Sequence, residues 1–216
     1  MRLRIAAIVA VLTGLVVAGC TDDGGDPPGS ASPGLSAPPS MTFEEAYQRV
    51  PLDGTSGLKI FWELPEGADT DEVLGARRAL AHVYWGSNAV DWTPVMATSR
   101  FLFTERYYQQ VLAGLGGSGA GDPYIGPIWV RFMGVEKLGP DQARVTFCTD
   151  IGWWFQSSWD KTDPRKDRAN LESVVMENVT TGDGERRWLA DQRWNPDADR
   201  APEYGAQCSD WARHTP

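Results

Sequence analysis

The chain has few of the residues on which metal and nucleophile chemistry depend. It contains three cysteines and two histidines among 216 residues, and it has no CxxC pair and no GxSxG motif. These absences argue against a zinc site and against the serine nucleophile of the α/β-hydrolases. The acidic clusters Asp160–Asp163–Asp167 and Asp197–Asp199 lack the spacing of a calcium-binding loop. We therefore predict neither a metal nor a cofactor, and we assign no catalytic residue.

The chain also lacks an apolar run of the roughly 20 residues that a membrane-spanning helix needs. A shorter apolar stretch, Ile5–Val17, follows Arg2 and Arg4 and ends in small residues before Cys20. Such a basic start, short apolar region and small-residue cleavage point make up a secretory signal peptide. The run from Val17 to Cys20 resembles the lipobox of bacterial lipoproteins. This resemblance implies cleavage before Cys20, a diacylglycerol on its thiol, and a lipid anchor in the outer face of the cell membrane.

Lysine is scarce, with four Lys against 16 Arg, and the net charge is −9. Removing residues 1–19 takes away two arginines and no acidic residue, so the charge becomes −11. An acidic domain repels nucleic acid, whose binding depends on Lys and Arg, and we exclude it as a partner. The excess of Arg, Ala, Gly and Trp is typical of high-GC bacteria, especially actinobacteria. Together with the lipobox, it indicates the outer face of a Gram-positive membrane.

The sequence divides into three segments. Residues 1–19 are the predicted signal peptide, residues 20–41 the lipidated cysteine and a disordered tether, and residues 42–216 a single domain. Of the 21 residues from Thr21 to Met41, 13 are Pro, Gly or Ser. Such a segment cannot bury enough surface to offset the entropy of ordering it.

Residue periodicity predicts helices first and strands afterwards. Thr42 and Glu45 form a capping box, and Val73, Ala76 and Leu80 recur at helical spacing. The expected helices are 42–50, 69–86 and 104–115, and residues 58–62 are expected to form either a short strand or an extended covering segment. The expected strands are 128–138, 143–155, 171–180 and 186–194, and a short helix precedes Trp211. Helices followed by antiparallel strands indicate an α+β fold with N-terminal helices packed on a curved sheet.

The strand over 143–155 alternates clearly between apolar and mixed positions. Val145, Phe147 and Trp153 share one face, which we assign to the core. Cys148, Asp150 and Trp154 then point outward. Because an even pair of cysteines in an exported domain favours a disulfide, we predict a Cys148–Cys208 bond. This bond would bring the tail and Trp211 onto the outer face of the sheet, where Trp154 and Trp211 become the outer-face aromatics.

The order of elements resembles the cone-shaped fold of the nuclear transport factor 2 superfamily, over 71–85, 104–115, 128–155 and 171–194. The strand 145–150, the turn 182–184 and the pair Cys208 and Trp211 also resemble uncharacterised actinobacterial lipoproteins. The superfamily resemblance implies a pocket between the helices and the sheet. Its candidate lining residues are Val83, Tyr84, Tyr108, Val145, Phe147 and Trp153.

Three functions remain open at this point, because members of that superfamily include isomerases, dehydratases, cyclases and simple binding proteins. The first is a non-enzymatic module that binds a small ligand or an envelope protein, which a dry aromatic cone without ionisable groups would favour. The second is an isomerase or cyclase, which a buried carboxylate beside a Tyr or His would favour. The third is glycan binding, which a coplanar exposed Trp pair would favour.

Overall fold

A computed structural model describes residues 41–115, 118–160 and 162–216. The predicted signal peptide, Cys20 and all of the tether before residue 41 lie outside the described residues. The compact unit runs from Ser40 to Pro216 and contains every helix and strand named below. Because this unit encloses its own hydrophobic core, we expect it to fold without the residues that precede it.

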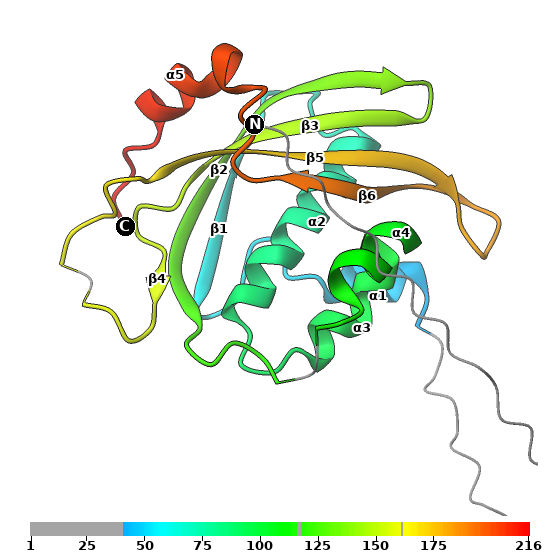
Figure 1. The fold of residues 1–216 in the computed structure, drawn as a ribbon, viewed down its shortest axis with the longest axis horizontal. Helices are drawn as coiled ribbons and strands as arrows, with labels where there is room; N and C mark the ends of the chain where they lie inside the picture. Colours follow the sequence, from blue (N-terminus) through cyan, green and yellow to red (C-terminus); the bar gives the residue numbers. More distant parts are fainter. Residues whose placement is uncertain (1–40, 116–117, 161) are drawn as a thin grey trace, which may run out of the picture. The chain divides into compact units, whose positions relative to one another are not determined.

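Helices and strands follow one another in mixed order along the chain (Figure 1). The helices are α1 (Phe43–Arg49), α2 (Asp71–Asn88), α3 (Thr93–Leu102), α4 (Glu105–Tyr107), the π-helical turn η1 (Tyr108–Leu112) and α5 (Ala201–Trp211). The strands are β1 (Leu58–Glu63), β2 (Tyr124–Gly139), β3 (Gln142–Asp150), β4 (Phe155–Gln156), β5 (Ala169–Thr180) and β6 (Arg186–Trp194).

The strands form one curved sheet in the order β1-β2-β3-β5-β6, with β4 paired to β2. The predicted α+β fold with helices on a curved sheet is confirmed (Figure 1). Two details differ from the prediction. The sheet is mixed, because β1 pairs parallel to β2 while the other pairs are antiparallel. The helices are also not all N-terminal, since α5 follows the last strand.

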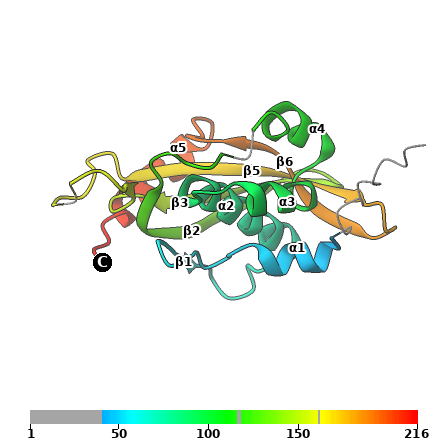
Figure 2. The same cartoon turned by 90° about the horizontal axis from the view of Figure 1, so that it is seen from below.

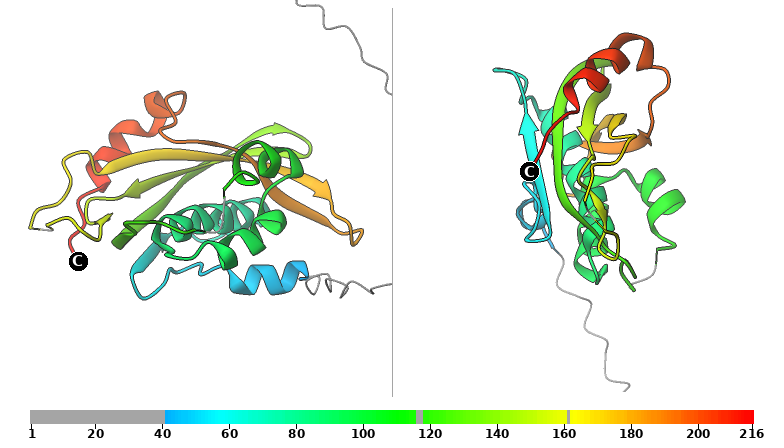
Figure 3. Two further views of the ribbon diagram at one scale, coloured as in Figure 1. Left: turned by 60° about the horizontal axis from the view of Figure 1, so that its bottom comes forward. Right: turned by 90° about the vertical axis from the view of Figure 1, so that its left-hand side faces the viewer.

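Helix α2 lies along the concave face of the sheet, as the views in Figure 2 and Figure 3 show. Its buried positions Val73, Ala76 and Leu80 recur at the three- and four-residue spacing that the sequence predicts. Gly75 lets the helix approach the sheet closely. A Cβ atom there would lie 2.8 Å from the backbone oxygen of Trp188. The core is therefore centred between α2 and the concave face.

The segment between α2 and β2 folds differently from the prediction. The expected helix over 104–115 is replaced by α4 and η1, and α3 before them was not predicted. Helix α3 begins where Asp91 accepts a hydrogen bond from the backbone N–H of Thr93, with Pro94 in the first turn. An acidic residue followed by proline in the first turn is a helix-start signal that the sequence already contained. The capping box of Thr42 and Glu45, by contrast, is confirmed.

Strand β3 ends at Asp150, earlier than predicted, and this changes the orientation of two tryptophans. A turn follows in which the Gly152 N–H donates to Asp150 Oδ1 at 2.9 Å. The turn interrupts the alternation, so the predicted orientations of Trp153 and Trp154 are wrong. Trp154 packs edge-on against Tyr84 on the concave side, with ring centroids 5.1 Å apart. Trp153 instead donates from Nε1 to the carbonyl of His214 in the tail.

The convex face of β3 carries the C-terminal tail. Cys148 and Cys208 form a disulfide, as the sequence predicts, and the bond closes a sequence separation of 60 residues. Helix α5 therefore lies on the opposite side of the sheet from α2 (Figure 3). Tyr204 and Trp211 pack around the disulfide together with Leu171 of β5. The predicted position of the tail is thus correct, and Trp211 packs there as expected, whereas Trp154 lies on the other side of the sheet and is not covered by the tail.

Candidate functional site

Two adjoining cavities lie on the concave side of the sheet and have volumes of about 520 and 530 Å³. They share four lining residues, which come from α2, β2 and β6: Val83, Ser87, Tyr124 and Arg193. Because their walls are shared, we treat them as one site and call it the concave cleft. Both volumes fall within the range of small-molecule sites in proteins.

The first cavity is predominantly apolar. Besides the shared residues, side chains from α2, α3 and the α4–η1 segment line it, including Trp92, Val95, Met96, Tyr107, Val111 and Leu112. Gly86 of α2 also faces it. A Cβ atom at Gly86 would meet only the Cγ1 atom of Val95, at an ordinary contact distance of 3.7 Å. The wall at Gly86 is therefore open to a larger side chain.

The second cavity is more polar. Its walls include the guanidinium-bearing residues Arg165 and Arg193 and the amides Asn170 and Asn195. Asp167 also lines it and is exposed to solvent. Aromatic rings form another wall, where Trp154 lies against Tyr124 with ring centroids 4.3 Å apart. The cleft thus changes from an apolar to a polar environment across the shared wall.

A buried carboxylate lies beneath the polar cavity. Glu172 of β5 is fully buried and accepts four hydrogen bonds. Its Oε1 accepts from the Tyr84 hydroxyl at 2.6 Å and from Thr149 Oγ1 at 3.1 Å. Its Oε2 accepts from Nε and Nη2 of Arg193 at 3.1 and 2.5 Å. Buried charges are stable in proteins when they are paired and hydrogen-bonded in this way.

This network fixes the protonation of Tyr84 and the position of Arg193. Burial, and then the neighbouring Glu172 carboxylate, raise the pKa of Tyr84 well above its usual 10. Tyr84 therefore remains a neutral hydroxyl that donates to Glu172. Arg193 lines both cavities, and its Nη1 donates no hydrogen bond within the described parts of the chain. The Nε and Nη2 edge of this guanidinium is thus held by Glu172, and Nη1 is available to a ligand.

A β-bulge brings Arg193 to the concave face. Val174 pairs with Arg193 and Met176 pairs with Ala190, with a register shift between them. Ala190 and Arg193 are three residues apart, and strict alternation would place them on opposite faces. The extra residue in the bulge restores both to the same side. The location of this charge therefore depends on strand pairing.

His82 lines the apolar cavity but is held by α3. Its Nε2 lies 2.9 Å from the Val95 carbonyl and 3.0 Å from Ser99 Oγ. Burial lowers the pKa of His82 to about 4, against a weaker opposing effect of the Val95 hydrogen bond. The imidazole is therefore neutral at pH 7, and the contact with Val95 assigns Nε2 as its donor.

The structure brings together only some of the predicted pocket residues. Val83 and Tyr84 line the cleft. Val145 and Phe147 are fully buried in the core beneath it and do not line either cavity. Tyr108 is absent from both linings and lies under the guanidinium of Arg100, whereas the adjacent Tyr107 lines the apolar cavity.

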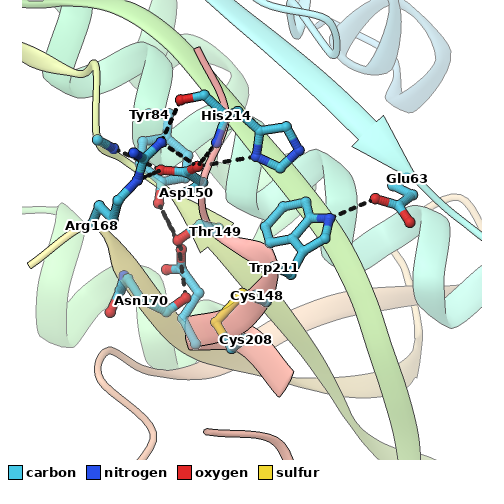
Figure 4. The surroundings of a disulfide bond; sticks show 12 residues. Glu63, Tyr84, Cys148, Thr149, Asp150, Arg168, Asn170, Cys208, Trp211 and His214 are labelled. Atoms are coloured by element: carbon cyan, nitrogen blue, oxygen red, sulfur yellow. Dashed lines mark hydrogen bonds and ion pairs between the residues drawn. A yellow bond between two sulfur atoms is a disulfide. The ribbon is translucent and has the colours of Figure 1, made fainter. Parts of the chain in front are cut away.

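The convex face has its own polar cluster, which secures the tail (Figure 4). Asp150 accepts two hydrogen bonds from Arg168, at 2.9 and 2.7 Å, and two from His214, through its backbone N–H and Nδ1. Burial alone would raise the pKa of Asp150, but these hydrogen bonds lower it. The outward position predicted for Asp150 is correct. Its environment is that of a structural clamp, because all its partners lie in the tail or the adjoining loop.

Aromatic residues near this clamp stack on one another. Phe61 and Trp129 are stacked with centroids 5.6 Å apart, and Trp129 stacks in turn on His214 at 4.9 Å. The Trp129 ring is thus engaged by an aromatic partner from β1 and by one from the tail. Trp211 donates from Nε1 to Glu63 at 2.8 Å. This arrangement is not the coplanar exposed Trp pair expected of a glycan-binding surface.

Within residues 41–115, 118–160 and 162–216, no helix combines the length and apolar composition needed to cross a membrane. The same residues contain no group of three His, Cys, Asp or Glu side chains placed to hold a metal ion. Comparison of the chain with protein-family models, curated proteins and solved structures gave no match. The resemblance to the nuclear transport factor 2 superfamily therefore stays a prediction.

Sequence reasoning missed Glu172 and Arg193, the buried ion pair at the concave cleft. Glu172 was detectable, because it shares the alternation of Val174 and Met176 on the buried face of β5. A carboxylate in phase with apolar core positions indicates a buried charge that needs a partner. The partner itself was not detectable, since the bulge in β6 determines which face Arg193 occupies.

Proposed function

We propose that the protein is a membrane-tethered extracytoplasmic lipoprotein whose domain binds a small ligand in the concave cleft. The observation that carries the binding proposal is the joining of an apolar and a polar cavity across one shared wall. Small-molecule sites are mostly apolar with a few fixed polar groups, and this description fits the cleft. The lipobox at Cys20 supports the tether and the location at the outer face of the cell membrane.

Binding is favoured over acid–base catalysis by the state of the buried carboxylate. A general base must reach the proton it removes, at about hydrogen-bond distance. Glu172 is fully buried, and both its oxygens already accept hydrogen bonds from Tyr84, Thr149 and Arg193. In this arrangement Glu172 holds Arg193 in place and presents no oxygen to the cleft.

One observation favours the alternative function of an isomerase or cyclase. A buried carboxylate does lie beside a tyrosine under the cleft, through the 2.6 Å hydrogen bond from Tyr84 to Glu172. If the site were catalytic, Tyr84→Phe would abolish turnover of a bound ligand while leaving its affinity nearly unchanged. If the site only binds, the ligand would be recovered unaltered from both proteins.

The binding proposal is tested by mass spectrometry of small molecules retained by the purified unit 40–216. Gly86→Leu should fill the apolar cavity without a backbone clash and remove the retained molecule. Gly205→Leu is the matched control, because Gly205 is also helical and its nearest obstacle, the Ala201 Cβ, is also 3.7 Å away. Retention in wild type and Gly205→Leu but not in Gly86→Leu is expected. No retained molecule in any of the three would count against a ligand site.

The tether is tested separately in cells. Lipid on Cys20 should place the wild-type chain in the detergent phase, since two acyl chains anchor a protein stably. Cys20→Ala should leave the chain uncleaved or released into the medium. Recovery of this variant in the detergent phase at the wild-type level, with normal cleavage, would refute the lipid anchor.

A further inference from the structure

The polar cavity of the concave cleft carries two arginines in its walls, Arg165 and Arg193. Arg193 lines both cavities, and Nη1 is its one guanidinium nitrogen that donates no hydrogen bond within the described residues, since Nε and Nη2 donate to Glu172. Arg165 also lines the polar cavity, and its side chain makes no hydrogen bond or ion pair among the described residues. Both carboxylate oxygens of Glu172 already accept hydrogen bonds from side chains of the protein. Two other carboxylates line the cleft: Asp167 is solvent-exposed. Asp122, at the apolar cavity, accepts hydrogen bonds from Ser157 and Ser158 with both oxygens.

These donors stand next to the apolar cavity rather than inside it. Arg193 belongs to the shared wall, so a ligand that contacts it can extend directly into the space between Trp92, Met96 and Leu112. An arginine guanidinium pairs well with carboxylate or phosphate oxygens. An apolar chain in the first cavity would supply the hydrophobic part of the affinity.

We propose that the ligand of the concave cleft is an acidic amphiphile, with its apolar part in the apolar cavity and its carboxylate or similar anion at Arg193. This proposal rests on the proposed binding function and specifies the chemical class of its ligand. Dodecanoate is the probe, because it has one apolar chain and one carboxylate. Its methyl ester has the same chain without the charge and is the matched ligand control.

Binding of both probes to the unit 40–216 is measured by calorimetry. The wild-type unit should bind dodecanoate about tenfold or more tightly than the ester, the effect of one charge-assisted hydrogen bond. Arg193→Met combined with Glu172→Gln should remove this preference without leaving an unpaired buried charge. Arg187→Gln is the matched control, because Arg187 lies on the same strand with a side chain of similar exposure, 21% against 22%. It should keep the wild-type preference.

The outcomes separate the ligand class from the binding function. Equal affinity of the wild-type unit for acid and ester, or an unchanged acid preference in the double variant, would refute the acidic amphiphile. The ligand site itself would survive that result if Gly86→Leu still removed the retained molecule. If the double variant does not fold, the acid–ester comparison on wild type and the loss of both affinities in Gly86→Leu still decide the proposal. If Gly86→Leu bound dodecanoate with unchanged affinity, the acyl chain would lie outside the apolar cavity and the proposal would be refuted.

Discussion

The pair of Glu172 and Arg193 gives a sharp prediction about stability. Arg193→Met removes both hydrogen bonds to Glu172 Oε2 and leaves a fully buried carboxylate without its counter-charge. Removing one partner of a buried ion pair costs about 3–5 kcal/mol of unfolding free energy. We expect about 3 kcal/mol, the low end, because the Arg193 side chain retains 22% exposure.

The assays are urea unfolding and thermal unfolding of the unit 40–216 at pH 7. For a domain of this size, about 3 kcal/mol corresponds to a fall in melting temperature of roughly 6–12 °C. Arg187→Met is the control on the same strand. Its partner Asp183 has a side chain that is 45% exposed, so this substitution should cost no more than about 1 kcal/mol.

A second substitution identifies the cause of the loss. Glu172→Gln keeps an oxygen that can accept from Tyr84 and Thr149 but removes the buried charge. Arg193→Met with Glu172→Gln should therefore be more stable than Arg193→Met alone, by at least about 1 kcal/mol. The reasoning is refuted if Arg193→Met costs no more than Arg187→Met, or if the second substitution destabilises the protein further.

Three further predictions concern the disulfide, the buried histidine and the tail clamp. Replacing Cys148 and Cys208 by Ala should lower the unfolding free energy by about 4 kcal/mol, because the bond closes a 60-residue separation; equal urea midpoints with and without reductant would contradict this. Because the pKa of His82 falls to about 4, protons bind the unfolded state preferentially between pH 6.5 and 4. Stability should thus drop by about 3 kcal/mol as the pH falls through this range, and the drop should disappear in His82→Gln. The pKa of Asp150 is lowered in the folded protein, so its carboxylate stabilises the fold at every pH above its unfolded pKa, near 4. This contribution is lost as the pH falls below that value. Asp150→Asn should weaken the dependence of unfolding free energy on pH below about 4 and should speed proteolysis near His214. An unchanged pH dependence would argue against the clamp.

Much of the domain was determined by local sequence patterns. The capping box at Thr42, the apolar spacing of α2 and the hairpin of β5 and β6 depend on residues close in sequence. The alternation of Val145, Phe147 and Cys148 likewise located the core face of β3 and the face that carries the disulfide. These features were predictable because side-chain periodicity follows directly from backbone geometry.

The concave cleft was decided by the tertiary structure. The turn after Asp150 reversed the expected sides of Trp153 and Trp154, and a periodicity argument extended through a turn cannot detect such a change. The bulge in β6 placed Arg193 on the concave face, beside a glutamate that is 21 residues away in the chain. Neither the bulge nor the pairing is a local property of the sequence, because both arise when strands choose a register that buries their apolar faces. The sequence alone therefore determined most of the elements and the buried faces of α2 and β3, and only the assembled sheet decided which charges meet beneath the cleft.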